Sequence, residues 1–103
     1  MSGSAAFREV MLQAIDDALL VLGEIVRAAI YDRIEKDCQI RRGEIPEQLE
    51  LFHKALQQLL GVAAKVMEKL IAKNLYRRLN LNFNEHENWT LVDYVDHAKK
   101  AHK

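Results

Sequence analysis

A row of basic side chains is the feature of this sequence best suited to binding chemistry. Its members follow one another every four residues, which places them along one side of a helix: Lys65, Lys69, Lys73 and Arg77, with Arg78 alongside. Such a row could contact a phosphate backbone or an acidic protein surface. It would equally suit the polar back of an amphipathic helix, which Lys and Arg commonly fill. We therefore treat these residues as a candidate partner-binding surface.

The histidines could in principle bind a metal or take part in catalysis. Asp93 and His97 are four residues apart and would share a helix face, as two zinc ligands do. A closed zinc site needs four ligands, and His86 and His102 would join only if the fold brought them close. His53 has no serine or cysteine near it in sequence that would make a triad recognisable, and no phosphate loop or nucleophile elbow is present. We expect no catalytic residue, no metal site, no cofactor and no enzyme activity.

Composition narrows the class of protein further. The 103 residues include 15 basic and 15 acidic side chains, so the formal net charge is zero, whereas dedicated nucleic-acid binders carry an excess of Lys and Arg. The single cysteine, Cys38, fits a reducing compartment. The longest apolar run, Ala18 to Leu22, is far shorter than a membrane span. We expect one cytoplasmic domain over residues 1–103, with no signal peptide and no membrane contact.

All the elements that would position these side chains are predicted to be helices. A first long helix is predicted over residues 5–37, because apolar residues recur at the three-four spacing of a helix face. Gly43 suits a left-handed turn in the connection that follows, and Pro46 suits the first position of a second helix. A third helix is predicted from Gly61 to Leu79. A last helix is predicted from about residue 89, where Thr90 and Asp93 have the spacing of a capping box with Asp in place of the usual Glu. Residues 1–4 and 99–103 are expected to fray.

A repeated Leu-Gly dipeptide indicates the architecture. Leu22-Gly23 and Leu60-Gly61 each lead into a helical segment of similar spacing, and we predict a bend or break at the second of them. The expected fold is an all-α bundle of four to five helices with a long N-terminal helix and a pseudo-repeated helical unit. Its first helix should pack antiparallel to the Gly61–Leu79 helix.

The middle of the first helix is apolar on nearly all sides. Such a helix must be covered nearly all round, either by its own bundle or by a second copy of the chain. We predict a homodimer, with Leu12, Leu19, Leu20 or Val21 as candidate contacts on the first helix and the Trp89 end as the alternative interface.

The order of these packing positions resembles a known family. The chain resembles a group of small all-helical archaeal proteins, the Nitrosopumilus-type output domains. The resemblance rests on a Leu-Gly pair followed by isoleucine, on Pro46 at the start of a helix, and on Leu59-Leu60-Gly61 followed by Ile71, Leu75 and Tyr76. The resemblance covers residues 14–98. It implies an all-helical archaeal domain, found alone or attached to sensing and regulatory proteins, without assigned catalysis or established active-site residues.

Three functional hypotheses follow. The leading one is a non-catalytic interaction or signalling-output module, homodimeric and with a protein partner. The alternative is a transcription-associated or nucleic-acid-contacting protein that uses the basic row. The third is an enzyme or metal carrier built around Asp93 and His97.

Overall fold

The described part of the chain is helical. The computed structural model describes residues 2–101, with side chains from residue 6 onward. Its elements are α1 (Ser2–Leu20), α2 (Glu24–Cys38), the short 3-10 helix η1 (Arg42–Glu47), α3 (Leu49–Leu60), α4 (Ala63–Arg78) and α5 (Leu91–Ala101). Residues 2–101 contain no strand, so the predicted all-α bundle is confirmed. None of their helices combines the length and apolar character needed to cross a membrane.

Helical structure reaches both ends of the described range. Helix α1 already begins at Ser2, and helix α5 continues to Ala101, so residues 2–4 and 99–101 are helical. Residues 1 and 102–103, which include His102, lie outside the described range.

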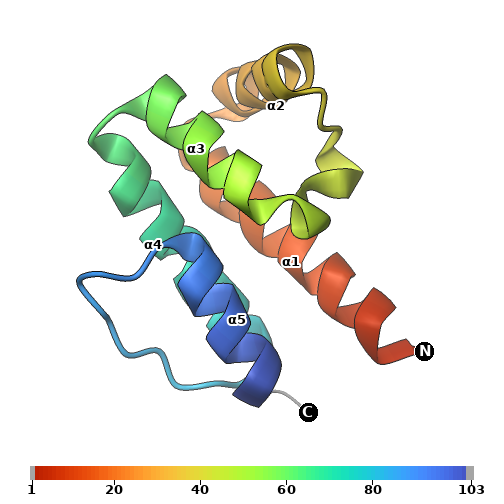
Figure 1. Ribbon diagram of the computed structural model, residues 1–103, viewed down its shortest axis with the longest axis vertical. Helices are drawn as coiled ribbons and strands as arrows, with labels where there is room; N and C mark the ends of the chain where they lie inside the picture. Colours follow the sequence, from red (N-terminus) through yellow and green to blue (C-terminus); the bar gives the residue numbers. More distant parts are fainter. Residues whose placement is uncertain (1, 102–103) are drawn as a thin grey trace.

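Two antiparallel helices, α1 and α4, form the centre of the bundle. They make the most extensive helix–helix contact in the molecule, and α3 crosses beside them (Figure 1). Helix α5 lies against α4 and α3, and the long loop 79–90 returns along the outside to reach its start (Figure 1). Helix α2 lies at the edge of the bundle, where it packs against α1 and α3. The expected antiparallel pairing of the first helix with the Gly61–Leu79 helix is therefore present.

The two Leu-Gly dipeptides lie at two helix junctions. Gly23 has φ 101° and Gly61 has φ 58°, values that side-chain-bearing residues seldom adopt. A Cβ atom at either glycine would meet no other atom within 4 Å, so backbone conformation rather than close helix crossing requires glycine there. The prediction of a break at Leu60-Gly61 is confirmed. The prediction of one helix over residues 5–37 is wrong, because the positive φ of Gly23 separates α1 from α2.

The connection between α2 and α3 also differs from the prediction. Gly43 has no positive φ; the left-handed residue is Gln39, which follows the last turn of α2 with φ 59°. Pro46 lies inside η1, and α3 begins at Leu49. A 3-10 turn accepts proline because its φ is close to the value that the ring imposes.

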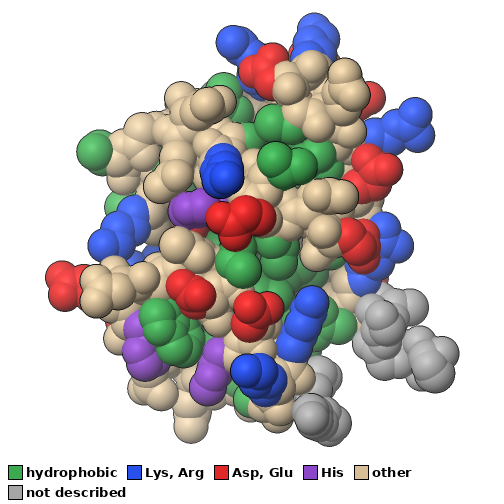
Figure 2. All heavy atoms as spheres, in the orientation of Figure 1, with side chains coloured by type: hydrophobic (Ala, Val, Ile, Leu, Met, Phe, Trp, Pro, Cys, Tyr) green, Lys and Arg blue, Asp and Glu red, His purple; other side chains and the backbone are tan. Residues whose placement is uncertain are grey.

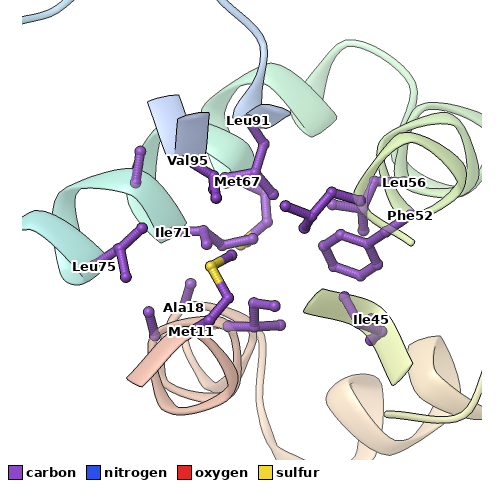
Figure 3. Close-up of a cluster of buried hydrophobic side chains, with 14 of the residues drawn as sticks. Met11, Ala18, Ile45, Phe52, Leu56, Met67, Ile71, Leu75, Leu91 and Val95 are labelled. Atoms are coloured by element: carbon purple, nitrogen blue, oxygen red, sulfur yellow. The ribbon is translucent and has the colours of Figure 1, made fainter. Parts of the chain in front are cut away.

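Every helix contributes to one hydrophobic core. Side chains from α1, η1, α3, α4 and α5 meet in it, as Figure 3 shows for Met11, Ile45, Phe52, Ile71 and Leu91. Leu12 and Leu19 also lie in the protein interior. These two leucines therefore cannot serve as dimer contacts, and the prediction that included them is wrong.

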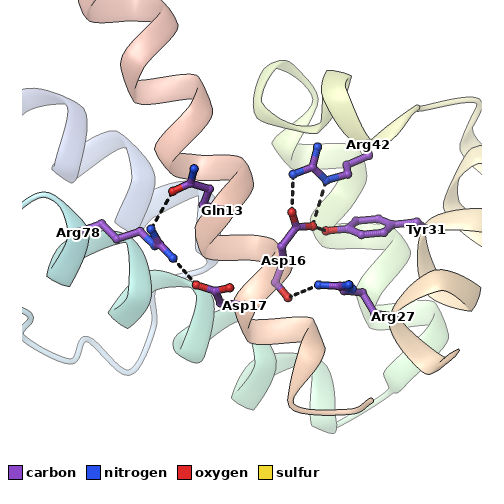
Figure 4. A network of polar contacts seen from close by, with 7 residues as sticks. All are labelled: Gln13, Asp16, Asp17, Arg27, Tyr31, Arg42 and Arg78. Carbon is purple, nitrogen blue, oxygen red and sulfur yellow. Dashed lines mark hydrogen bonds and ion pairs between the residues drawn. The ribbon is translucent and has the colours of Figure 1, made fainter. Parts of the chain in front are cut away.

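Polar contacts hold α1 to its neighbours on two sides (Figure 4). On one side the Asp16 carboxylate accepts hydrogen bonds from the Tyr31 hydroxyl, at 2.5 Å, and from the Arg42 guanidinium. Arg27 donates to the backbone carbonyl of Asp16 at 3.4 Å. On the other side Arg78 of α4 contacts α1. Asp16 thus ties α2 and η1 to the middle of α1.

The Asp16 network should make stability depend on pH. Burial by itself raises the pKa of the Asp16 carboxyl, but hydrogen bonds from Arg42 and Tyr31 outweigh it and bring the pKa below its ordinary value of 3.8. Since the folded pKa is lowered, the contribution of Asp16 is complete above about pH 5 and is lost as the pH falls below about 4. We expect Asp16→Asn to lower the free energy of unfolding most near neutral pH, with the difference from wild type narrowing in acid.

Urea unfolding of both proteins across this pH range checks the expectation. Asp32→Asn is the matched control, because Asp32 forms only an exposed pair with Lys36 on the surface of α2. If the two variants lost the same amount of stability at every pH, the network would have no special role.

Candidate functional site

A histidine and a buried glutamate form the most unusual polar contact of the structure. His53 of α3 and Glu68 of α4 approach to 2.5 Å between Nδ1 and Oε2, with 13% and 7% of their side-chain surfaces exposed. A buried carboxylate is costly unless its oxygens have partners. Here the second oxygen, Oε1, accepts the backbone N–H of Leu91 at 2.9 Å, at the start of α5. Glu68 therefore connects three helices.

Two carboxylates together satisfy the first amides of α5. The Asp93 carboxylate accepts the N–H of Thr90 at 2.9 Å, as the predicted Thr90–Asp93 capping arrangement requires. The next amide, that of Leu91, is capped by Glu68 from another helix. Negative charge near a helix N-terminus is favourable, so both acids stabilise the start of α5.

Sequence reasoning missed Glu68 as a site residue. In the sequence it is the only acidic residue between Lys65 and Arg78. A signal was nevertheless present, because Glu68 lies four residues after Ala64 and three before Ile71, both of which are buried. A charged residue at such a register position must find a partner in the interior. Its partner His53, 15 positions earlier on another helix, could not be read from spacing.

An open pocket of about 750 Å³ lies beside this pair. Its walls come from α3, from the α3–α4 junction with the first turns of α4, and from the loop that precedes α5; the lining residues include His53, Val62, Lys65, Glu68, Glu87 and Trp89. The face of the molecule that carries α3, α5 and the loop mixes acidic and basic side chains, with histidines on both the α3 and α5 sides (Figure 2). We call the pocket lined by these residues the His53 pocket.

Aromatic side chains fix the loop that forms one wall of the pocket. The Trp89 and His86 rings stack with their centroids 3.8 Å apart, and Tyr94 meets the Trp89 ring edge-on. The Tyr94 hydroxyl accepts the N–H of His86 at 2.9 Å and donates to its carbonyl at 3.1 Å. Tyr76 donates to the Tyr94 carbonyl at 2.7 Å, and burial raises the pKa of Tyr76 to about 12. The pocket wall is thus held in place by packing from α4 and α5.

The basic row does follow one side of α4, but intrachain contacts occupy much of it. Lys69 forms an ion pair with Glu85 at 2.5 Å, and this hydrogen bond lowers the pKa of Glu85 and raises that of Lys69. Arg78 pairs with Asp17 of α1 and donates to Gln13 at 2.8 Å (Figure 4).

The other three basic side chains have weaker attachments. Arg77 donates to the Asn74 side chain at 3.1 Å. The Lys73 ammonium lies 5.9 Å from the centre of the Phe83 ring. Lys65 lines the His53 pocket and has no ion pair among the described residues. The row therefore does not present five free cations to a partner.

Asp93 and His97 do share α5, but the described side chains around them have other partners. Asp93 is engaged with Thr90, and His97 stacks on Tyr76 with ring centroids 6.3 Å apart. Within the described residues no group of three or more His, Cys, Asp or Glu side chains is placed to hold a metal ion.

A second candidate surface is the corner between α1 and α2. Five large apolar side chains are exposed there, namely Leu20, Val21, Leu22, Ile25 and Val26, and we call this group the corner ridge. Val21 is 71% exposed and Ile25 is 86% exposed. Leu20 and Val21 were predicted as dimer contacts, and the structure leaves both open to a partner; the other three members were not predicted.

Comparisons of the chain with protein-family models, with curated proteins and with solved structures found no match. The resemblance to the archaeal output domains therefore remains a prediction.

Proposed function

We propose that this chain is a cytoplasmic, non-catalytic interaction module of the signalling-output type that self-associates through the corner ridge. The observation that carries the proposal is the exposure of five large apolar side chains in one short segment of a well-packed bundle. Contiguous apolar surface on a small protein commonly marks an interaction site. The signalling part of the proposal rests on the resemblance to archaeal output domains.

The local structure explains why this segment has no cover. Helix α2 buries only Ile30 and Ile34, because it lies at the edge of the bundle. The break at Gly23 turns the chain before the apolar run of α1 ends, so Val21 and Leu22 fall in the turn rather than in the core. The apolar residues on the first turns of α2 are then left exposed by the part of the chain that the structure describes.

A second copy suits this surface better than an unrelated partner. Apolar residues lie on both sides of Ile25: Leu20, Val21 and Leu22 precede it, and Val26 with exposed Ala28 and Ala29 follow. A two-fold axis near Ile25 would therefore place apolar surface on apolar surface in both copies.

The nucleic-acid alternative has less support. Two of its five basic residues, Lys69 and Arg78, are neutralised by Glu85 and Asp17 within the chain. Phosphate binding depends on cations that are free to replace counterions, so a row reduced in this way is a weak site.

Self-association is tested by measuring the solution mass with light scattering over a range of concentrations. We expect a dimer, and we expect Ile25→Asp to weaken it by about 30-fold or more, because a central apolar anchor contributes about 2 kcal/mol or more. Val62→Asp is the matched control, since Val62 is 96% exposed but lies outside the ridge. A wild-type monomer at every concentration, or a dimer unaffected by Ile25→Asp, would contradict the proposal.

A further inference from the structure

We propose that the His53 pocket binds a small zwitterion of the amino-acid class. This inference does not rest on self-association, because none of the pocket residues belongs to the corner ridge. The volume of about 750 Å³ lies in the range of small-molecule sites, which combine apolar walls with a few convergent polar groups.

The buried pair leaves one ring nitrogen of His53 for a ligand. Nδ1 is held by Glu68 Oε2, and a histidine held in this way donates from Nδ1 to the carboxylate. In the neutral ring the other nitrogen, Nε2, is then an acceptor, and no hydrogen bond within the described residues uses it. Both oxygens of Glu68 already have partners, so Glu68 orients His53 rather than serving as the main ligand contact.

The charges of the pocket lie on different elements and have opposite signs. Lys65 comes from α4 and can bind a carboxylate, while Glu87 comes from the loop before α5 and can bind an ammonium group. A ligand with a single charge could pair with only one of these two groups. A zwitterion can pair with both at once.

The remaining walls suit an apolar side chain. The Trp89 indole lines the loop side of the pocket. Val62 also lines the pocket at the α3–α4 junction but is 96% exposed, so Trp89 is the main apolar wall. The Trp89 indole is stacked on the His86 ring, which holds it in place without a ligand. It is therefore a preformed wall of the pocket. We therefore choose L-leucine and L-phenylalanine as probes.

Binding is tested on the full chain by following backbone amide signals in NMR titrations to about 10 mM ligand. We expect shifts at His53, Lys65 and residues 87–90 with either amino acid. The N-acetyl and the amide derivatives, which each lack one charge, should bind about tenfold more weakly or worse. Equal binding by the N-acetyl derivative would indicate a simple anion site and would overturn the proposal, as would no binding by either amino acid.

Two variants test the assignment of the charges. Lys65→Gln should weaken binding of the amino acids by about tenfold, and Glu87→Gln should do the same. Lys54→Gln is the matched control, because Lys54 is exposed on α3 but does not line the pocket. Both charged positions are exposed, so folding should be kept, which the dispersion of the amide signals verifies. Binding that is unchanged in both variants would place the ligand elsewhere and overturn the proposal.

Discussion

Replacing Glu68 by alanine is expected to lower the free energy of unfolding by about 3 kcal/mol. The change removes the acceptor of two groups in the interior, His53 Nδ1 and the N–H of Leu91. Leaving a buried donor without a partner costs about 1–3 kcal/mol, and both donors lose theirs here. Urea unfolding followed by circular dichroism measures the total effect.

Hydrogen exchange locates the effect of Glu68 in the structure. In Glu68→Ala the Leu91 amide should exchange faster, since α5 loses a cap. Glu68→Gln should keep part of the protection, because its amide oxygen can still accept from Leu91. Glu35→Ala is the control: Glu35 is exposed on α2, so its loss should change stability by no more than about 0.5 kcal/mol. A Leu91 amide equally protected in wild type and Glu68→Ala would show that the cap is unimportant.

Truncation of Phe52 to alanine should cost about 3–5 kcal/mol, the largest effect we expect from a single core substitution. The ring is fully buried between Ile45 of η1 and Leu56 of α3, and it faces the side chains of α1 and α4 (Figure 3). Its loss would remove apolar burial and leave a cavity where four elements meet.

The neighbouring residue supplies the control for Phe52. Leu51 lies one position earlier on α3 and is 43% exposed, so Leu51→Ala should cost less than about 1 kcal/mol. Chemical denaturation of both variants gives the comparison. Equal losses in the two would mean that the core does not converge on Phe52.

The helical fold and several boundaries were predictable because they depend on local pattern. Apolar residues every three or four positions indicated the helices, and Thr90 with Asp93 indicated the start of the last one. The break at Gly23 was missed because Leu19 to Leu22 continue the apolar run without interruption. Only the backbone conformation of Gly23, with its positive φ, distinguishes a turn from a continuing helix at that point.

The candidate site was largely hidden from sequence reasoning. The basic row was identified because its members share one helix, but its neutralisation by Glu85 and Asp17 depends on elements far apart in the chain. The same holds for His53 and Glu68, which only the packing of α3 on α4 brings together. Leu12 and Leu19 were assigned to a dimer contact because an all-round apolar helix does not reveal which side its own chain covers.

The pairing of α1 with α4 has a consequence for synthesis of the protein on the ribosome. Asn74 bonds to the carbonyl of Ala14, 60 residues earlier, so the centre of the bundle cannot close until α4 has been made. At a synthesis rate of about 5–20 residues per second, the apolar face of α1 remains uncovered for several seconds before α4 has been made. During that interval Met11, Ile15 and Leu19 stand open to chaperones or to other nascent chains, and we expect them to be the segment of this protein that is most easily captured before folding.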